Sequence, residues 1–410
     1  MFRQLITVAA SVILLPWPIP AWAPPGVEAK ASAEAVTAVS TIDLQYQRLQ
    51  TALQRYRAIA DAGGWPEVPD GPTIHPDTED LRLPALARRL TITGDLPDSD
   101  MEVSTFEYNE TLQDGVRRFQ ARHGLETDAL AGRATLRALN VPVERRIDQI
   151  RVNLERVRWH PEVENDDLIL VNIPAFKAHV IDDGEIVWTT DVIVGDSENK
   201  TPVFQSMLKF VVFNPTWTVP HSIASEELLP TIKRDPTFFR RGNYDLLDPS
   251  GNIVDPSSVD WSAVTKRSFS FTLVQKPGPA NQLGRVKFMF PNEYSVCMHD
   301  TPDKSLFARA ERAFSHGCIR VAEPLGLAEI LLSNEEWTGK QVDSQLDSNV
   351  TKTVVLADPL PVHVVYWTAE VDDLGVMHFY DDIYEWDAKV LETLDKPFES
   401  DHHDQPAASY

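Results

Sequence analysis

The segment 314–321 reads FSHGCIRV and combines a possible nucleophile with groups that could support it. A cysteine nucleophile needs a base that forms the thiolate, a group that orients the base, and donors for the oxyanion. Cys318 is the candidate nucleophile. His299, at the end of an upstream strand-like run, is the candidate base, because a neutral imidazole accepts protons near neutral pH. Gly317 permits a tight turn in which its own amide and that of Cys318 could donate to an oxyanion. The two segments predict a cysteine acyl-transfer site.

Two questions about this site stay open at the level of sequence. Asp300 adjoins His299, but neighbours on a strand point to opposite faces, so a backbone carbonyl is an equally good orienting group. The same alternation places Cys297 on the strand face of His299. Cys297 is then either a small apolar packing residue or a thiol that approaches Cys318 and forms a disulfide that blocks the nucleophile.

A metal site is the rival interpretation of the same residues. Cys297, His299, His316 and Cys318 supply two thiols and two imidazoles, which are ligand types of structural zinc. Ligand pairs in such sites usually stand about two to four residues apart on turns. Here one residue separates the members of each pair, so we expect neither a metal nor a cofactor.

The composition is that of a soluble protein with two or three domains. The 410 residues are 43% hydrophobic and 24% charged, with a net charge of -23. Binding to nucleic acid or to an anionic membrane surface needs clustered lysine and arginine, and the acidic balance argues against both. Because Cys297 and Cys318 are the only cysteines, the chain is not a disulfide-dense scaffold.

The first 33 residues predict a signal peptide. Arg3 precedes the apolar run from Leu5 to Leu15, which is too short to span a bilayer. Candidate cleavage sites are AWA at 21–23 and ASA at 31–33, and an uncleaved N-terminal anchor is the alternative. No later apolar run is long enough to span a membrane, so we expect a secreted, soluble protein.

Helical periodicity dominates the N-terminal part of the chain. It predicts helical scaffold segments within 34–80 and 141–160 and a small helical module at 81–140. Strand patterns begin at Leu168, and the segment DDG at 182–184 predicts a hairpin turn. The segment from about 221 to 265 breaks the strand pattern and is interpreted as a helix-loop insertion that could cover a site. Strands are expected to resume at 270–274 and 286–290.

We therefore expect a multidomain α+β protein. A small helical module is followed by a mainly β domain at 161–345 that carries the insertion, then by a C-terminal β and scaffold segment at 346–396. The polar tail at 397–410 is predicted to be disordered.

The helical module resembles a peptidoglycan-binding type 1 domain. The resemblance rests on QDGVRRFQ at 113–120, HGL at 123–125 and Gly132. The chain departs from the usual Asp-Gly of this family at Asp128-Ala129. A helical packing domain without a ligand is an equal alternative, because a fold does not establish a function.

The order of His299 before Cys318 separates the site from papain-like proteases, which place the cysteine first. With SHGCIR at 315–320 it resembles the L,D-transpeptidase (YkuD) catalytic domain. NPTWTVP at 214–220, KPGPANQLGRVKF at 276–288 and HDTP at 299–302 resemble the larger, YcbB-like periplasmic subgroup, which also carries a peptidoglycan-binding module and a capping subdomain. The resemblance implies a protein of the periplasm that is associated with the cell wall.

The resemblance also implies the reaction. Cys318 would attack the carbonyl of meso-diaminopimelate in a tetrapeptide stem, release D-alanine and form a thioester, with His299 moving the protons. The side-chain amine of a second stem would then complete a 3→3 crosslink. Gly317 and Cys318 would donate to the oxyanion, and carbapenem-type β-lactams would be covalent inhibitors. Alternatives are an L,D-carboxypeptidase or hydrolase that uses water, and a catalytically silent peptidoglycan-binding protein.

Four further residues are implied to line the substrate site, namely Ser315, His316, Arg320 and Trp217. Arg320 either binds a substrate carboxylate or forms an ion pair that holds the loop. Trp217 either contacts the stem or is a buried packing residue.

Overall fold

The computed structural model describes residues 41–97, 106–159, 167–333 and 337–397. The predicted signal peptide and the predicted disordered tail beyond residue 397 lie outside these ranges. Within them, no helix combines the length and the apolar character that crossing a membrane requires.

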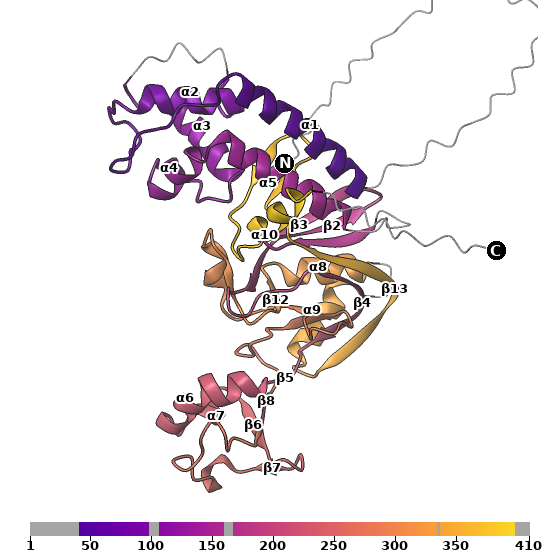
Figure 1. Cartoon of the computed structure of the whole chain (residues 1–410). Coiled ribbons are helices and arrows are strands. Elements are labelled where there is room, and N and C mark those ends of the chain that lie inside the picture. The colour runs from indigo at the N-terminus through magenta and orange to yellow at the C-terminus, as the bar shows by residue number, and fades with distance from the viewer. Residues whose placement is uncertain (1–40, 98–105, 160–166, 334–336, 398–410) are drawn as a thin grey trace, which may run out of the picture. The chain divides into compact units, whose positions relative to one another are not determined.

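Helices make up most of the described N-terminal part of the chain (Figure 1). They are α1 (Thr41–Asp61), α2 (Leu83–Thr93), α3 (Glu110–Ala121), α4 (Arg133–Leu139) and α5 (Val143–Arg158). The apolar faces predicted from periodicity are buried: Leu49 and Tyr56 of α1 pack with Ile150 of α5, and the same cluster includes Phe379 of a C-terminal hairpin. This hairpin consists of β14 (Ala369–Val371) and β15 (Met377–Phe379) and is followed by α10 (Asp387–Leu394).

The helical module has a core of its own around Leu112, Val116 and Phe119. Helix α3 begins where the Asn109 side chain accepts a hydrogen bond from the Leu112 N–H. Ala129 adopts a left-handed backbone conformation with φ of 62° and is buried. Glycine adopts this conformation at less cost, which explains why glycine is usual here in the family that the module resembles.

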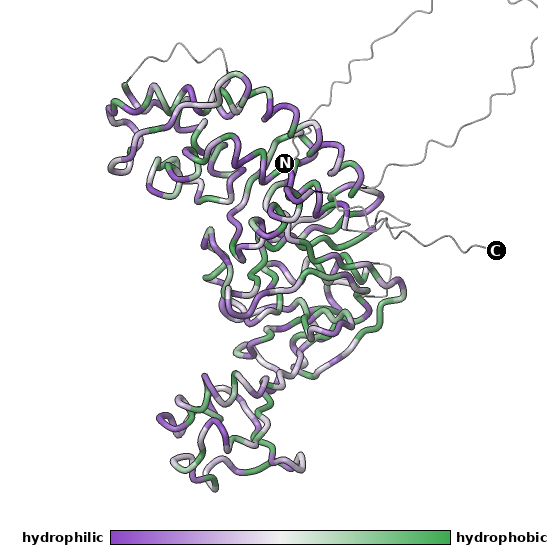
Figure 2. Tube along the Cα trace, viewed as in Figure 1, coloured by the Kyte–Doolittle hydropathy of each residue, from purple (hydrophilic) through white to green (hydrophobic). Residues whose placement is uncertain are grey.

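The second part of the chain is built on a nine-stranded sheet with the order β11-β3-β12-β10-β9-β4-β13-β1-β2. The strands are β1 (Leu168–Asn172), β2 (Lys177–Asp182), β3 (Glu185–Gly195), β4 (Phe204–Phe213), β9 (Val286–Met289), β10 (Met298–His299), β11 (Ala313–Ser315), β12 (Ile319–Val321) and β13 (Lys352–Val365). β2 also pairs with β3, so the sheet closes on itself around its apolar core. Helices α8 (Pro324–Leu331) and α9 (Gly339–Asp347) pack on this core. Apolar stretches concentrate along these strands (Figure 2).

Strand β13 lies near the middle of this sheet, between β4 and β1. The sequence analysis assigned residues 346–396 to a separate C-terminal segment. In the structure β13 pairs in parallel with β1, and its register places Val364 beside Val171. An apolar strand pattern shows that a strand exists, but not which distant strand it joins.

The insertion is a small α/β unit rather than a helix-loop segment (Figure 1). Its sheet has the order β5-β8-β6-β7. The elements are β5 (Trp217–Thr218), η2 (Ile223–Leu228), α6 (Leu229–Arg234), α7 (Phe238–Arg241), β6 (Tyr244–Leu247), β7 (Ile253–Val254), η3 (Pro256–Ser258) and β8 (Thr272–Gln275). Strand β8, which the sequence analysis placed in the main sheet, pairs with β5 and β6 instead. The unit buries its own core, including Phe238, Leu246 and Leu273.

The fold class predicted from the sequence is confirmed: a helical module precedes a mainly β domain, and the whole is α+β. The difference lies in the insertion, which contains a sheet as well as helices.

Candidate active site

Three neighbouring strands bring the candidate residues to one face of the sheet. His299 of β10 lies opposite Arg320 of β12 in a parallel pairing and opposite Lys287 of β9 in an antiparallel pairing. Residues that lie opposite each other on neighbouring strands point to the same face. Lys287, His299 and Arg320 therefore form a row, and the residues alternating with them face the apolar core.

Cys297 and Cys318 each precede their strand by one residue and continue the same register. Their sulfur atoms are 3.5 Å apart, and the Ile319 N–H donates to the Cys297 carbonyl at 2.9 Å. Both thiols are free; Cys297 is 8% exposed, whereas Cys318 is half-buried. The structure thus places Cys297 in contact with the candidate nucleophile, with both thiols free.

The contact between the two thiols changes their acidity. The hydrogen bond from Cys297 lowers the pKa of Cys318 to about 7 against the opposing effect of burial, and the charges of Lys287 and Arg320 add to this lowering. The same hydrogen bond, together with burial, raises the pKa of Cys297. Cys318 is therefore the thiol that ionises first and the more reactive of the two.

We predict that this pair sets the pH dependence of Cys318 reactivity. The alkylation rate with iodoacetamide should rise about tenfold per pH unit below 7 and level off above it, because the thiolate is the reacting form. In Cys297→Ala the midpoint should move to higher pH, since the largest cause of the lowered pKa is removed. A midpoint that stays in place in this variant would contradict the prediction. Mass spectrometry of the Cys318 peptide measures the rate.

Two hydroxyls hold the loop that carries Cys318. Ser315 Oγ donates to the Cys318 carbonyl at 2.5 Å and accepts from the Gly317 N–H at 3.1 Å. Gly317 has a φ of 104°, which favours glycine, and its carbonyl accepts from the Thr201 hydroxyl at 2.9 Å. The turn thus depends on the loop itself and on Thr201, which is distant in sequence.

This geometry bears on two of the expected site residues. Ser315 is 2% exposed and both of its hydrogen bonds stay within the loop, so it holds the loop of the nucleophile, and its contact with a substrate stays a prediction. The Gly317 amide, predicted to serve an oxyanion, is already engaged with Ser315. Within the described parts of the chain the Cys318 N–H has no hydrogen-bond acceptor, so this amide is the one that is free to donate to an oxyanion.

His299 is neutral and oriented by a backbone carbonyl. Its Nδ1 lies 2.5 Å from the Asp300 carbonyl oxygen, which only accepts, so Nδ1 carries the proton and Nε2 has a free lone pair. Burial lowers the pKa of His299 to about 4. No hydrogen bond joins His299 to Cys318 among the residues described. Catalytic hydrogen bonds are often long before a substrate binds, so His299 stays the candidate base.

The carboxylate of Asp300 stabilises the turn after His299. It accepts from the backbone N–H groups of Arg285 at 2.8 Å and Thr301 at 2.7 Å and forms an ion pair with Lys304 at 2.6 Å. Gly284, with a φ of 60°, lies against it, and a Cβ there would come within 2.3 Å of the carboxylate. The turn that orients His299 therefore requires glycine at 284.

We predict that Gly284→Ala destabilises the protein by on the order of 2 kcal/mol, because of backbone strain and displacement of the Asp300 carboxylate. Chemical denaturation measures this loss. Gly251→Ala is the matched control, since Gly251 has a φ of 84° but open space around it. Equal losses in the two variants would show that strain alone, and not the contact with Asp300, matters at position 284.

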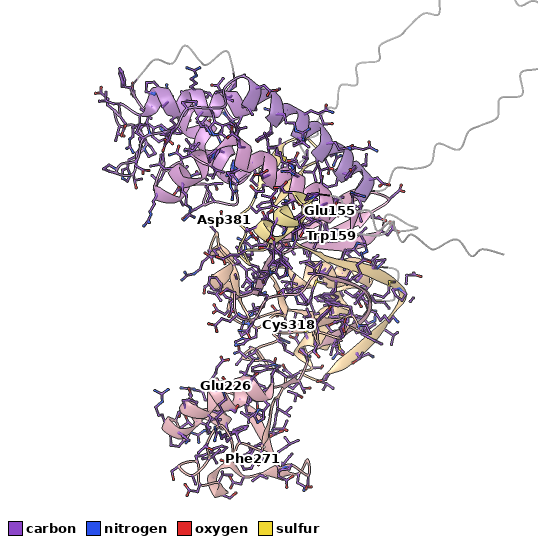
Figure 3. The ribbon with its side chains drawn as sticks, viewed as in Figure 1. Glu155, Trp159, Glu226, Phe271, Cys318 and Asp381 are labelled. Atoms are coloured by element: carbon purple, nitrogen blue, oxygen red, sulfur yellow. The ribbon has the colours of Figure 1, made fainter. Side chains whose placement is uncertain are left out.

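The insertion contacts the nucleophile loop through one polar pair. His316 Nε2 and Glu227 Oε1 are 2.7 Å apart, and both side chains are largely exposed. Figure 3 labels Cys318 in the sheet domain and Glu226 and Phe271 in the insertion. Trp217 is half-buried against the core of the insertion, which agrees with its packing interpretation. His316 therefore bonds to the insertion and not to the two thiols.

Arg320 and Lys287 are two cations beside His299. In the described ranges neither side chain forms a hydrogen bond or a close ion pair, and burial lowers the pKa of Arg320 against the opposing charge of Asp303. Both interpretations of Arg320 stay predictions. The sequence analysis gave no role to Lys287 or Glu227. The position of Lys287 beside His299 follows from the pairing of β9 with β10, which the sequence does not show.

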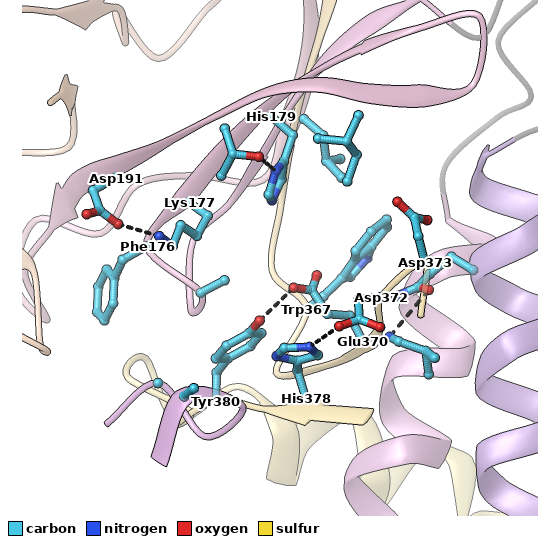
Figure 4. Close-up of a pocket in the computed structure, with 18 of the residues that line it drawn as sticks. Phe176, Lys177, His179, Asp191, Trp367, Glu370, Asp372, Asp373, His378 and Tyr380 are labelled. Carbon is cyan, nitrogen blue, oxygen red and sulfur yellow. Dashed lines mark hydrogen bonds and ion pairs between the residues drawn. The ribbon is translucent and has the colours of Figure 1, made fainter. Parts of the chain in front are cut away.

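Among the described residues no three or more His, Cys, Asp or Glu side chains are grouped so that they could hold a metal ion. A separate cavity of about 460 Å³ lies beside β2 and the C-terminal hairpin (Figure 4). Its polar groups bond to one another: Tyr380 to Glu370 at 2.7 Å and His378 to Asp372 at 2.9 Å. These contacts hold elements together and assign no chemistry to the cavity.

Comparison with known proteins connects this geometry to two families. Residues 166–355 match the family model described as L,D-transpeptidase catalytic domain (YkuD), and residues 86–139 match the one described as "Putative peptidoglycan binding domain". A curated protein of Haemophilus influenzae, described as "Putative L,D-transpeptidase", is 36% identical over 242 residues. The match covers 59% of this chain and 48%, about half, of that protein.

Solved structures of L,D-transpeptidases are also similar, at lower identity. One from Stackebrandtia nassauensis is 12% identical with a TM-score of 0.28, covering 72% of this chain and 97% of the other. One from Mycobacterium smegmatis is 16% identical with a TM-score of 0.23, covering 48% of this chain and 58% of the other. Scores this low do not establish a shared fold.

Proposed function

We propose that this chain, which carries an L,D-transpeptidase catalytic domain of the YkuD family and a peptidoglycan-binding type 1 domain, crosslinks peptidoglycan stem peptides through a thioester on Cys318. The observation that carries the proposal is a half-buried Cys318 thiol, with a pKa lowered to about 7, two residues before Arg320, the strand partner of a neutral His299. A thiol that ionises near neutral pH and an imidazole with a free Nε2 lone pair are the groups that acyl transfer through a thioester requires.

In the first half-reaction the Cys318 sulfur attacks the carbonyl of the third stem residue, meso-diaminopimelate. The Cys318 N–H stabilises the oxyanion, and His299 Nε2 takes the thiol proton and passes it to the departing amine of D-alanine. The C–N bond breaks and a thioester remains. In the second half-reaction the side-chain amine of another stem attacks the thioester, loses its proton to His299 and releases the thiolate, which leaves a 3→3 crosslink.

Two cations beside the nucleophile support a substrate that carries carboxylates. Arg320 and Lys287 flank His299 on neighbouring strands, and neither forms a hydrogen bond or close ion pair among the described residues, although the charge of Asp303 acts on Arg320. A guanidinium binds a carboxylate through two parallel hydrogen bonds, so we assign Arg320 to a stem carboxylate, with Lys287 adding to the positive field. His316, with Glu227 of the insertion, would border the same site.

The proposed place of action is the periplasm, in contact with the cell wall. The support is the apolar segment near the N-terminus and the match of residues 86–139 to a peptidoglycan-binding family. Carbapenem-type β-lactams should acylate Cys318, because their strained amide is an acyl donor to a thiolate. Binding of the glycan by the helical module is a proposal that is independent of the acyl transfer.

Incubation with tetrapeptide-containing muropeptides tests the function. We expect crosslinked dimers and released D-alanine, read by mass spectrometry. Tripeptides without dimers would instead assign an L,D-carboxypeptidase, since hydrolysis shares the first half-reaction. No turnover, together with no carbapenem adduct on the reduced protein, would favour the silent peptidoglycan-binding protein.

A further inference from the structure

Cys297 contacts the nucleophile, yet acyl transfer as proposed does not require a second thiol. Its sulfur lies 3.5 Å from that of Cys318, and these are the only two cysteines in the chain. We propose that Cys297 is a resolving cysteine: a disulfide-class oxidant converts Cys297 and Cys318 into an intramolecular disulfide, which shuts the active site until a thiol reduces it.

The backbone already has the spacing that a disulfide needs. Cys297 and Cys318 extend the parallel pairing of β10 and β12 by one position, and the Ile319 N–H is bonded to the Cys297 carbonyl at 2.9 Å. Neighbouring strands lie about 4.8 Å apart, within the range of about 4.4–6.8 Å between Cα atoms that disulfides span. The sulfurs need to approach by only about 1.5 Å to reach bonding distance, which side-chain rotation supplies.

The different exposure of the two thiols determines the order of the steps. Cys318 is half-buried and can meet an oxidant, whereas Cys297 is 8% exposed and meets only Cys318. The Cys318 thiolate attacks one sulfur of the oxidant, whose S–S bond breaks and releases a thiolate. Cys297 then attacks the Cys318 sulfur, passes its proton to the departing groups and releases the second thiolate. Two electrons leave the protein, and the oxidant becomes two thiols.

Closing the pair removes the nucleophile and also protects it. A Cys318 sulfur held in a disulfide cannot form a thioester, and it is shielded from the irreversible higher oxidation states that an isolated thiolate can reach. The hydroxyl of Ser315 bonds to the backbone of Gly317 and Cys318 and to neither thiol, so these hydrogen bonds do not oppose closure of the pair. Only the loss of acyl transfer on oxidation rests on the proposed function. The disulfide itself is measured without turnover.

Intact-mass analysis of the full chain after treatment with oxidised glutathione tests the pair. The wild type should lose two hydrogen atoms, retain no glutathione and yield a peptide that joins Cys297 to Cys318. It should lose its reaction with imipenem and regain it after dithiothreitol. Cys297→Ser should instead retain one glutathione on Cys318, because no thiol is present to resolve it; Cys297→Ala serves the same purpose should the serine variant fold poorly.

Each outcome separates the two proposals. A wild-type protein that keeps glutathione, or whose mass does not change, overturns the resolving role of Cys297. A disulfide that forms in a protein without transpeptidation supports the pair and counts against the proposed function alone.

Discussion

Cys318→Ala is expected to abolish both the imipenem adduct and the formation of crosslinked muropeptides, with a fall in rate of at least about 10⁴-fold. The physical reason is that no other group on this face of the sheet replaces the thiolate: Cys297 is buried and its pKa is raised. The measurement is the mass of the reduced protein after exposure to imipenem, together with product analysis of muropeptide incubations. Cys318→Ala should unfold at nearly the wild-type temperature, because the side chain is half-buried and small.

Cys318→Ser is the matched control for this loss. It keeps the shape and a hydrogen-bonding group, but its hydroxyl does not ionise near neutral pH, so it should be nearly as inactive as alanine. Turnover retained in either variant would mean that the acyl group is carried elsewhere, and the mechanism proposed above would be wrong. Retention of the adduct on Cys297 in the alanine variant would identify the neighbouring thiol as the substitute.

His299→Gln is expected to lower the rate of acylation by about 10²–10⁴-fold, the usual contribution of a positioned general base. Glutamine keeps a polar side chain of similar reach but does not accept the proton. In the wild-type enzyme the pKa of about 4 keeps His299 neutral throughout the range from pH 5 to 8, so the base is not lost as pH falls through this range. The acylation rate should therefore follow the ionisation of Cys318 alone, rising with pH through about 7.

Stopped-flow measurement of imipenem acylation against pH checks this prediction. A second inflection near pH 6.5 would show that His299 titrates like an exposed histidine and is not buried as described. His316→Gln is a suitable comparison, because His316 is exposed and bonded to Glu227 and is not assigned to proton transfer. It should change the acylation rate far less than His299→Gln does.

Local patterns account for the parts of the fold that could be predicted. Helices α1, α3 and α5 bury one face each, and that face is visible as a repeat of apolar residues along the chain. The β2–β3 hairpin is equally local, since Asp183 and Gly184 adopt the positive φ angles that its turn requires. The candidate nucleophile and base were also proposed from sequence, through residue type and their order along the chain, and both assignments stay predictions.

The placement of β8 and β13 could not be predicted in the same way. Their apolar alternation is that of any half-buried strand, and nothing local distinguishes the sheet of the insertion from the main sheet. The hydrogen-bond donors to the oxyanion are another feature that the sequence could not predict. A glycine beside the nucleophile suggested two free amides, but Ser315 folds back and takes the one from Gly317.

The chemistry proposed for this site therefore comes from the residues themselves: a candidate cysteine nucleophile, an earlier histidine, and the match of this part of the chain to the model of an L,D-transpeptidase catalytic domain. Tertiary structure alone decided what surrounds them. It set Lys287 and Arg320 on either side of His299, oriented that imidazole with the Asp300 carbonyl, and brought the Cys297 sulfur to 3.5 Å from Cys318. The reason is that these contacts depend on the register between strands that are distant in sequence, and a shift of one residue would turn every one of these side chains to the opposite face.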